Sequence, residues 1–205
     1  PETGAQILMG YPLIPGEPLT RARFQAIRDE GVLPHIAAQL ADFLRDVHTF
    51  PIDATNRVDP QAQWQNLYDQ FREQLYPYMR ADAQAQVSAD FEAFLGDGAN
   101  FAFEPVLIHG DLGGSNILFD AEQGCISGVI DFGGATVGDP AQDVGALRVS
   151  LGDAFLGRIF SHNPALQQTM SRVTFIQSTY ALQQALYALR DGNQDDFDDG
   201  IQAYI

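Results

Sequence analysis

The segment 109–133 contains the residue types from which a phosphoryl-transfer site could be built. It reads HGDLGGSNILFDAEQGCISGVIDFG, and its three notable polar residues are Asp111, Asn116 and Asp131. Glycines lie between the first two of these, and they let the backbone turn tightly so that both side chains reach one cavity. The spacing therefore predicts a loop that presents a carboxylate and an amide to the same space.

The chemistry of these groups is specific. A substrate hydroxyl needs a carboxylate that orients it and accepts its proton, and Asp111 is placed for that. Mg²⁺ prefers oxygen ligands, which an Asn116 amide and an Asp131 carboxylate supply together with phosphates. An Asp and an Asn of the catalytic loop and an Asp after a later strand have these tasks in the general protein-kinase template.

Two predicted strands position the two metal-binding side chains. Residues 117–119 and 126–130 are apolar β-type runs joined by DAEQG, which is rich in turn-forming residues. Asn116 comes just before the first strand and Asp131 ends the second. A hairpin would therefore bring Asn116 and Asp131 close together in space.

The rest of the chain is predicted to be mostly helical. A short strand is expected at 106–108, a strand and extended connector at 6–14, and a turn at 15–19. Apolar residues at helical spacing, together with capping and breaking residues, predict helices at about 20–30, 33–48, 60–79, 82–95, 140–150, 153–160, 165–190 and 194–204. The expected fold class is α+β, with a small β-hairpin set into a helical body.

The motifs HGDLGGSN, VIDFG and GDPAQDV, in this order, closely resemble the aminoglycoside phosphotransferase family within the protein-kinase-like fold. That family has glycine where protein kinases have arginine, here Gly110, so the resemblance implies an assembled site without a phosphorylation switch. It also implies that Asp111 is the catalytic base and that Asn116 and Asp131 bind Mg²⁺.

The same resemblance assigns supporting roles and a nucleotide site. His109 would support the catalytic loop, and Asp143, after the Gly-Asp-Pro turn, would stabilise it. ILMGYPLIPGEPL is similar to the hinge between the two kinase lobes, where adenine bonds to backbone groups. The carbonyl of Pro12 and the amide of Ile14 are the expected partners of ATP or GTP. The apolar floor under the base would be Leu118 and Ile130.

The resemblance implies a division into lobes. Residues 1–19 would be the end of the N-terminal lobe and the hinge, and residues 20–205 the helical C-terminal lobe, with the catalytic loop in 107–133 and a helical subdomain for the substrate. Kinases also use a Gly-rich loop and a strand lysine to hold the phosphates. This chain has no such loop before the hinge, and all eleven basic residues are arginines. We therefore expect that the nucleotide lobe is absent and that the isolated chain is inactive.

Composition limits the partners. The net charge of −16 argues against nucleic acid, whose phosphates attract lysine and arginine, and favours a cationic small molecule. Weak candidates for contacting such a substrate are Glu104, Asp153, Asp195 and Asp196. No apolar run is long enough to cross a membrane. One cysteine and the lack of a signal-peptide pattern favour the cytoplasm, and the oligomeric state is left open.

The leading functional hypothesis is transfer of the γ-phosphate of ATP or GTP to a hydroxyl of a small molecule, with an aminoglycoside as one candidate. The alternative is a non-catalytic, pseudokinase-like binding module, which the missing lysine favours and the intact metal pair opposes. A metal-dependent phosphoesterase ranks last, because such sites gather more His and Asp ligands.

Overall fold

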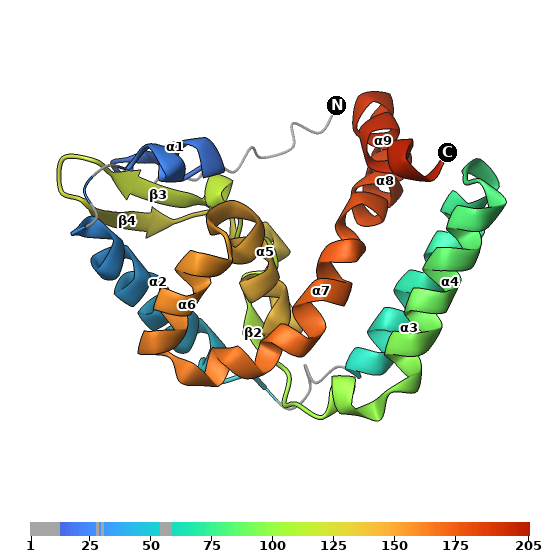
Figure 1. The fold of residues 1–205 in the computed structure, drawn as a ribbon, viewed down its shortest axis with the longest axis horizontal. Helices are drawn as coiled ribbons and strands as arrows, with labels where there is room; N and C mark the ends of the chain where they lie inside the picture. The colour runs from blue at the N-terminus through green and yellow to red at the C-terminus, as the bar shows by residue number, and fades with distance from the viewer. Residues whose placement is uncertain (1–12, 28, 30, 54–58) are drawn as a thin grey trace, which may run out of the picture.

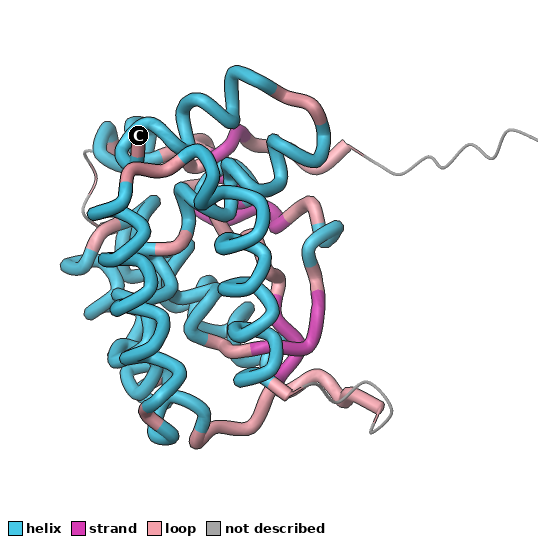
Figure 2. The backbone as a smooth tube through the Cα atoms, turned by 90° about the vertical axis from the view of Figure 1, so that its right-hand side faces the viewer, coloured by secondary structure: helices cyan, strands magenta, loops and turns pink. Residues whose placement is uncertain are grey.

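The computed structural model describes residues 13–27, 29, 31–53 and 59–205. Helices make up most of this part of the chain, with short strands among them (Figures 1 and 2). The helices are α1 (Arg21–Ala26), α2 (Val32–His48), α3 (Pro60–Gln70), α4 (Ala81–Gly96), α5 (Ala141–Leu151), α6 (Asp153–His162), α7 (Met170–Ser178), α8 (Tyr180–Asp191) and α9 (Gln194–Ile201). The strands are β1 (Glu17–Pro18), β2 (Val106–Ile108), β3 (Ile117–Asp120), β4 (Cys125–Val129) and β5 (Thr136–Gly138).

Two small antiparallel sheets carry the polar segment. The first has the strand order β1-β3-β4, and the second pairs β2 with β5. In the β3–β4 hairpin, Ile117 pairs with Val129, and the register shifts between Leu118 and Phe119. Strands β2 and β3 and the hairpin agree with the sequence prediction, whereas β1 and β5 were not predicted. β1 forms because the expected turn at 15–19 lies against β3, where Glu17 pairs with Phe119.

The helices form two groups, which Figure 1 shows side by side. Helices α2, α5 and α6 pack around the hairpin, while α3 and α4 run together on the other side, with α7 and α8 between the two groups. Aromatic rings join α3 and α4 to α7, since Phe94 of α4 stacks on Phe175 with centroids 3.8 Å apart and Trp64 of α3 meets Phe175 edge-on at 5.2 Å. Trp64 and Phe94 are part of the hydrophobic core, and Phe175 packs against it.

Two predicted helices are interrupted. The helix expected at 60–79 is α only to Gln70, and it continues as a π-helical turn and a 3₁₀ turn that contains Pro77. The helix expected at 165–190 is divided into a 3₁₀ segment, α7 and α8. At the break, the hydroxyls of Ser178 and Thr179 donate to the carbonyls of Phe175 and Ile176, so that side chains replace part of the backbone ladder.

A buried ion pair fastens the start of α5 to α7. Arg172 donates to both oxygens of Asp139, with Nε–Oδ2 at 2.6 Å and Nη2–Oδ1 at 2.8 Å. Asp139 was predicted to be a turn former, and its Oδ1 does accept from the N–H of Ala141 at 2.8 Å. The ion pair with Arg172 is an additional role that the sequence did not indicate. The guanidinium also lies over the ring of Phe103, 4.5 Å from its centroid.

We predict that Arg172→Met lowers the free energy of unfolding by about 3–5 kcal/mol, because it leaves the buried Asp139 carboxylate without its partner. The same change at Arg45, whose partner Asp42 is exposed, should cost at most about 1 kcal/mol. Urea denaturation measures both. Equal losses of unfolding free energy in the two variants would contradict the importance of burial. Adding Asp139→Asn to Arg172→Met should recover part of the loss, because the unpaired buried charge is then removed.

Candidate active site

The hairpin brings the two predicted metal-binding residues together. The N–H of Ile130 donates to the carbonyl of Asn116 at 2.9 Å, which extends the pairing of β3 and β4 by one step. Asn116 thus lies directly opposite the residue that precedes Asp131. The two side chains come from neighbouring strand ends, as the sequence predicted.

The buried amide of Asn116 fixes the catalytic loop. Its Nδ2 donates to the carbonyl of Asp111 at 2.8 Å and to Oδ2 of the same residue at 2.9 Å. These two bonds commit the amide nitrogen, so Oδ1 is the atom of Asn116 that is available to a cation. One side chain therefore connects the Asp111 carboxylate to the place where a metal ion would bind.

Asp131 has an unusual backbone conformation. Its φ of 61° is left-handed, and it is the single non-glycine residue with positive φ in the described part of the chain. Its Oδ1 accepts from the N–H of Gly133 at 3.3 Å. Non-glycine residues adopt this conformation at a cost, and such residues cluster at functional sites. The turn thereby holds an exposed carboxylate just beyond the end of β4.

The donor set fits Mg²⁺. An amide oxygen and a carboxylate are hard ligands, and Mg²⁺ typically takes one or two protein carboxylates while phosphates and waters complete its shell. The described residues contain no group of three or more His, Cys, Asp or Glu side chains that could hold a metal by themselves. Asn116 and Asp131 are therefore suited to a metal that arrives with a phosphorylated ligand.

His109 joins the catalytic loop to the end of the hairpin. Its buried ring has Nε2 3.0 Å from the carbonyl of Ile130, while Nδ1 lies 3.3 Å from the N–H of Asp111. A carbonyl requires a donor and an N–H requires an acceptor, so the ring is the neutral tautomer with its proton on Nε2. The ring also packs on Phe132, with centroids 4.7 Å apart.

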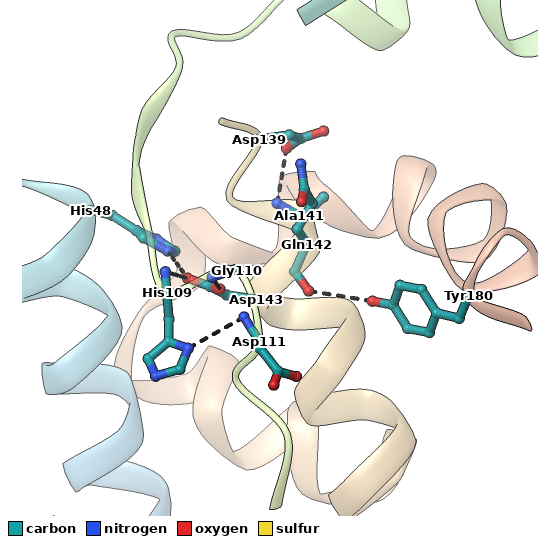
Figure 3. A network of polar contacts seen from close by, with 9 residues as sticks. All are labelled: His48, His109, Gly110, Asp111, Asp139, Ala141, Gln142, Asp143 and Tyr180. Carbon is teal, nitrogen blue, oxygen red and sulfur yellow. Dashed lines mark hydrogen bonds and ion pairs between the residues drawn. The ribbon is translucent and has the colours of Figure 1, made fainter. Parts of the chain in front are cut away.

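Asp143 collects three hydrogen bonds beneath the same loop, as Figure 3 shows. Its Oδ2 accepts from the N–H of His109 at 3.1 Å and from Nε2 of His48 at 3.0 Å, and its Oδ1 accepts from the N–H of Gly110 at 3.0 Å. Asp143 is fully buried. These are the contacts that the predicted loop-stabilising role requires. The Asp111 carboxylate points away from this network (Figure 3).

His48 was not among the predicted site residues. It has a structural role, because its Nε2 bonds the buried carboxylate of Asp143. The available signal was its position at the end of a strongly amphipathic helix, which shows that it is half-buried but does not show its partner. Its partner is 95 positions away in the sequence.

We predict that Asp143→Ala lowers the free energy of unfolding by about 2–6 kcal/mol, because the buried N–H groups of His109 and Gly110 lose their acceptor at about 1–3 kcal/mol each. Asp143→Asn keeps one acceptor oxygen and should cost clearly less. Denaturation midpoints in urea compare the two variants. Losses below about 1 kcal/mol in both would contradict the proposed support of the loop.

A cavity of about 640 Å³ opens beside Asp111. Residues of the loop before β3, of β5 and of helices α3, α5, α7 and α8 line it. Its lining residues are Gln63, Trp64, Asn66, Leu67, Gln70, Gly110, Asp111, Thr136, Val137, Gln142, Ala146, Ile176, Tyr180, Gln183 and Tyr187. The cavity is large enough for a drug-sized acceptor molecule.

None of the four acidic residues predicted as weak substrate contacts lines this cavity. Asp153 instead pairs with Arg148, whose hydrogen bonds hold the pKa of the Asp153 carboxyl below its usual value. Asp195 and Asp196 lie in the first turn of α9, where Asp196 bonds the Asn193 cap. Glu104 is exposed in the loop before β2. The acidic surface and the cavity are therefore distinct parts of the molecule.

The predicted nucleotide-contacting residues are partly described. Ile14 lies against the hairpin, since a Cβ built on Gly128 would be 2.9 Å from Cγ2 of Ile14. Gly128 pairs with Leu118, so Ile14 and Leu118 lie at the same step of the hairpin. Ile130 follows β4 and bonds Asn116 and His109 through its backbone. Pro12 lies outside the described residues.

Comparison with known proteins shows the family to which the chain belongs. The sequence pattern of the phosphotransferase enzyme family, APH, matches residues 4–170. The chain belongs to this family. It is also 35% identical over 148 residues to viomycin phosphotransferase of Streptomyces vinaceus, a match that covers 71% of this chain and 50% of that protein. The chain thus spans about half the length of this curated phosphotransferase.

Solved phosphotransferase structures have the same fold. The GDP and kanamycin complex of APH(2")-IIia superposes with a TM-score of 0.82 at 22% identity, covering 93% of this chain and 67% of that one. The apoenzyme of macrolide 2'-phosphotransferase MphH from Brachybacterium faecium gives 0.69 at 21% identity, covering 95% and 68%. The predicted α+β, kinase-like fold class is confirmed. No helix among the described residues is long and apolar enough to span a membrane.

Proposed function

We propose that this chain carries the metal-binding and acceptor-binding part of a small-molecule phosphotransferase, which moves the γ-phosphate of ATP or GTP to an acceptor hydroxyl. The observation that supports this most directly is the Asn116 side chain. It holds the Asp111 carboxylate at 2.9 Å while its free oxygen and Asp131 are left for a cation at the hairpin end. A base beside a metal site is the arrangement that phosphoryl transfer needs.

In the proposed reaction, the acceptor alcohol lies in the cavity with its hydroxyl against Asp111. The hydroxyl oxygen forms a bond to the γ-phosphorus, the bond from that phosphorus to the β–γ bridging oxygen breaks, and the hydroxyl proton passes to Asp111. Asn116 and Asp131 would hold Mg²⁺, which neutralises phosphate charge when bound. His109 and Asp143 keep the loop in place, so that Asp111 is oriented before the substrate arrives.

The nucleotide-binding residues are proposed from their positions in the sequence. The carbonyl of Pro12 and the amide of Ile14 would bond the edge of the base, and Leu118 and Ile130 would form the apolar floor under it. Because the chain contains no lysine to bind the α- and β-phosphates, we propose that these groups are held by a nucleotide lobe outside these residues and that the chain alone transfers no phosphate.

The relatives suggest an antibiotic as the acceptor, since the names of the similar proteins refer to viomycin, kanamycin and macrolides. The test is a panel of such compounds with Mg·ATP and Mg·GTP, applied to the natural reading frame that contains this chain and to the 205 residues alone. Acceptor-dependent release of nucleoside diphosphate by the longer protein would support the proposal. Nucleotide binding without turnover on any acceptor would instead favour the pseudokinase-like module, which the missing lysine also supports.

A further inference from the structure

We propose that the acceptor cavity recognises an uncharged molecule rich in amide and hydroxyl groups, and that it discriminates against polycations. This inference rests on the proposed function, because it names the substrate class of the same site. It also departs from the expectation of a cationic substrate, which followed from the net charge of the whole chain.

The lining of the cavity carries very little charge. Among the described residues that line it, Asp111 is the one charged side chain, and its role is in the reaction itself. The other polar side-chain groups are five amides, two phenols, a hydroxyl and the indole N–H of Trp64. Apart from Trp64, these side chains are Gln63, Asn66, Gln70, Gln142, Gln183, Tyr180, Tyr187 and Thr136. Amides both donate and accept, so such a wall matches amide and hydroxyl groups and offers ammonium groups no counter-charge.

Neighbouring contacts fix two of the amides, which come from different helices. On α3, Gln70 donates to Oδ1 of Asn66, which leaves the amide nitrogen of Asn66 to donate to a ligand. On α8, Nε2 of Gln183 donates to the Thr179 hydroxyl at 2.8 Å, which leaves its oxygen to accept. The cavity lining thereby presents a donor from one helix and an acceptor from another. A ligand with both kinds of group matches this pair better than a cation that only donates.

A cation lies at the edge of the same cavity. Nη2 of Arg190 donates to Oε1 of Gln70 at 2.6 Å, and its Nε lies 3.4 Å from Oε1 of Gln74. The guanidinium is also 6.0 Å from the ring centroid of Tyr187, which lines the cavity. A positive group against two lining residues disfavours ammonium groups at this edge of the cavity.

Tyr180 adds a neutral donor close to the reacting group. Burial raises the pKa of its hydroxyl, and the nearby carboxylates of Asp143 and Asp111 raise it further. The phenol therefore keeps its proton at neutral and moderately alkaline pH. It lies 3.4 Å from the carbonyl of Gln142, a long contact that leaves the hydroxyl able to turn toward a ligand (Figure 3). It cannot act as a counter-ion for a cationic acceptor.

The experiment compares kanamycin with its fully N-acetylated form, in which neutral amides replace the ammonium groups on the same scaffold. Calorimetry without nucleotide, on the natural reading frame that contains this chain, measures binding of the two forms. We expect the acetylated form to bind roughly tenfold more tightly, with little change between low and high salt. Tighter binding of kanamycin that weakens with salt, or no binding of either form, would overturn the inference.

Added charge provides the matched control. Gln63→Glu combined with Gln183→Glu should reverse the preference toward kanamycin, because two carboxylates then face the ligand. Gln168→Glu adds a carboxylate at an exposed position outside the cavity and should leave the preference unchanged. An unchanged preference in the double variant would overturn the assignment of these amides. These experiments measure binding and not phosphate transfer. Failure of the proposed function would therefore be seen separately, as acceptor binding without turnover in the longer protein.

Discussion

Asp111→Asn is expected to lower the turnover of the phosphotransferase by about a hundredfold to ten-thousandfold, because the amide cannot accept the proton of the acceptor hydroxyl. The replacement has the same shape, and its amide oxygen can still accept from Nδ2 of Asn116 as Oδ2 does now. The loop should therefore keep its place, and acceptor affinity should change little. Single-turnover assays on the natural reading frame, together with calorimetry of the acceptor, measure the two effects independently.

Glu122→Gln is the matched control for Asp111→Asn. It removes one carboxylate from the exposed turn of the same hairpin, at a position away from the cavity, and should leave turnover unchanged. Wild-type turnover in the Asp111→Asn variant would show that the base is assigned to the wrong residue. A loss of turnover accompanied by an equal loss of acceptor binding would show that Asp111 acts in binding and not in proton transfer.

Gly110→Ala is expected to lower the free energy of unfolding by about 3–5 kcal/mol and to remove activity. The φ of Gly110 is +82°, and a Cβ there would be 2.2 Å from the carbonyl oxygen of Gly134. The catalytic loop would have to move away from the turn that contains Asp131. The Gly110 conformation thus gives a physical reason why arginine, the protein-kinase residue at this point, cannot be placed here.

Gly152→Ala is the matched control, because it introduces a side chain at positive φ without the steric clash expected in Gly110→Ala. Gly152 has nearly the same φ of +84°, but a Cβ there would meet nothing within 4 Å. Its replacement should cost only the strain of its backbone conformation (φ 84°, ψ 164°), about 1–3 kcal/mol. Urea denaturation of both variants gives the comparison. Equal losses of unfolding free energy in the two variants would contradict this explanation. They would show that the close approach of Gly110 to the Gly134 carbonyl is not the reason for glycine at position 110.

The placement of the loop and hairpin residues could be predicted from the sequence because their geometry is local. Glycines between Asp111 and Asn116 allow a short turn, and two adjacent apolar runs with a turn between them can form one hairpin register. The hairpin then fixes where Asn116 and Asp131 lie relative to each other, whatever packs around them. Helix positions were also largely predictable, apart from breaks such as the one at Thr179, where hydroxyls compete for backbone carbonyls.

Only the tertiary structure decided which groups support the loop and which line the cavity. The Asp143–His48 and Asp139–Arg172 contacts join residues 95 and 33 positions apart, and they exist because α2, α5 and α7 pack around the hairpin. The sequence pattern does not distinguish the glutamines of α3 and α8 from ordinary solvent-facing residues, and it does not show that they line one cavity. The sequence alone determines the net charge, but the packing of helices determines where that charge lies, and it leaves the acidic side chains of α9 outside the acceptor cavity.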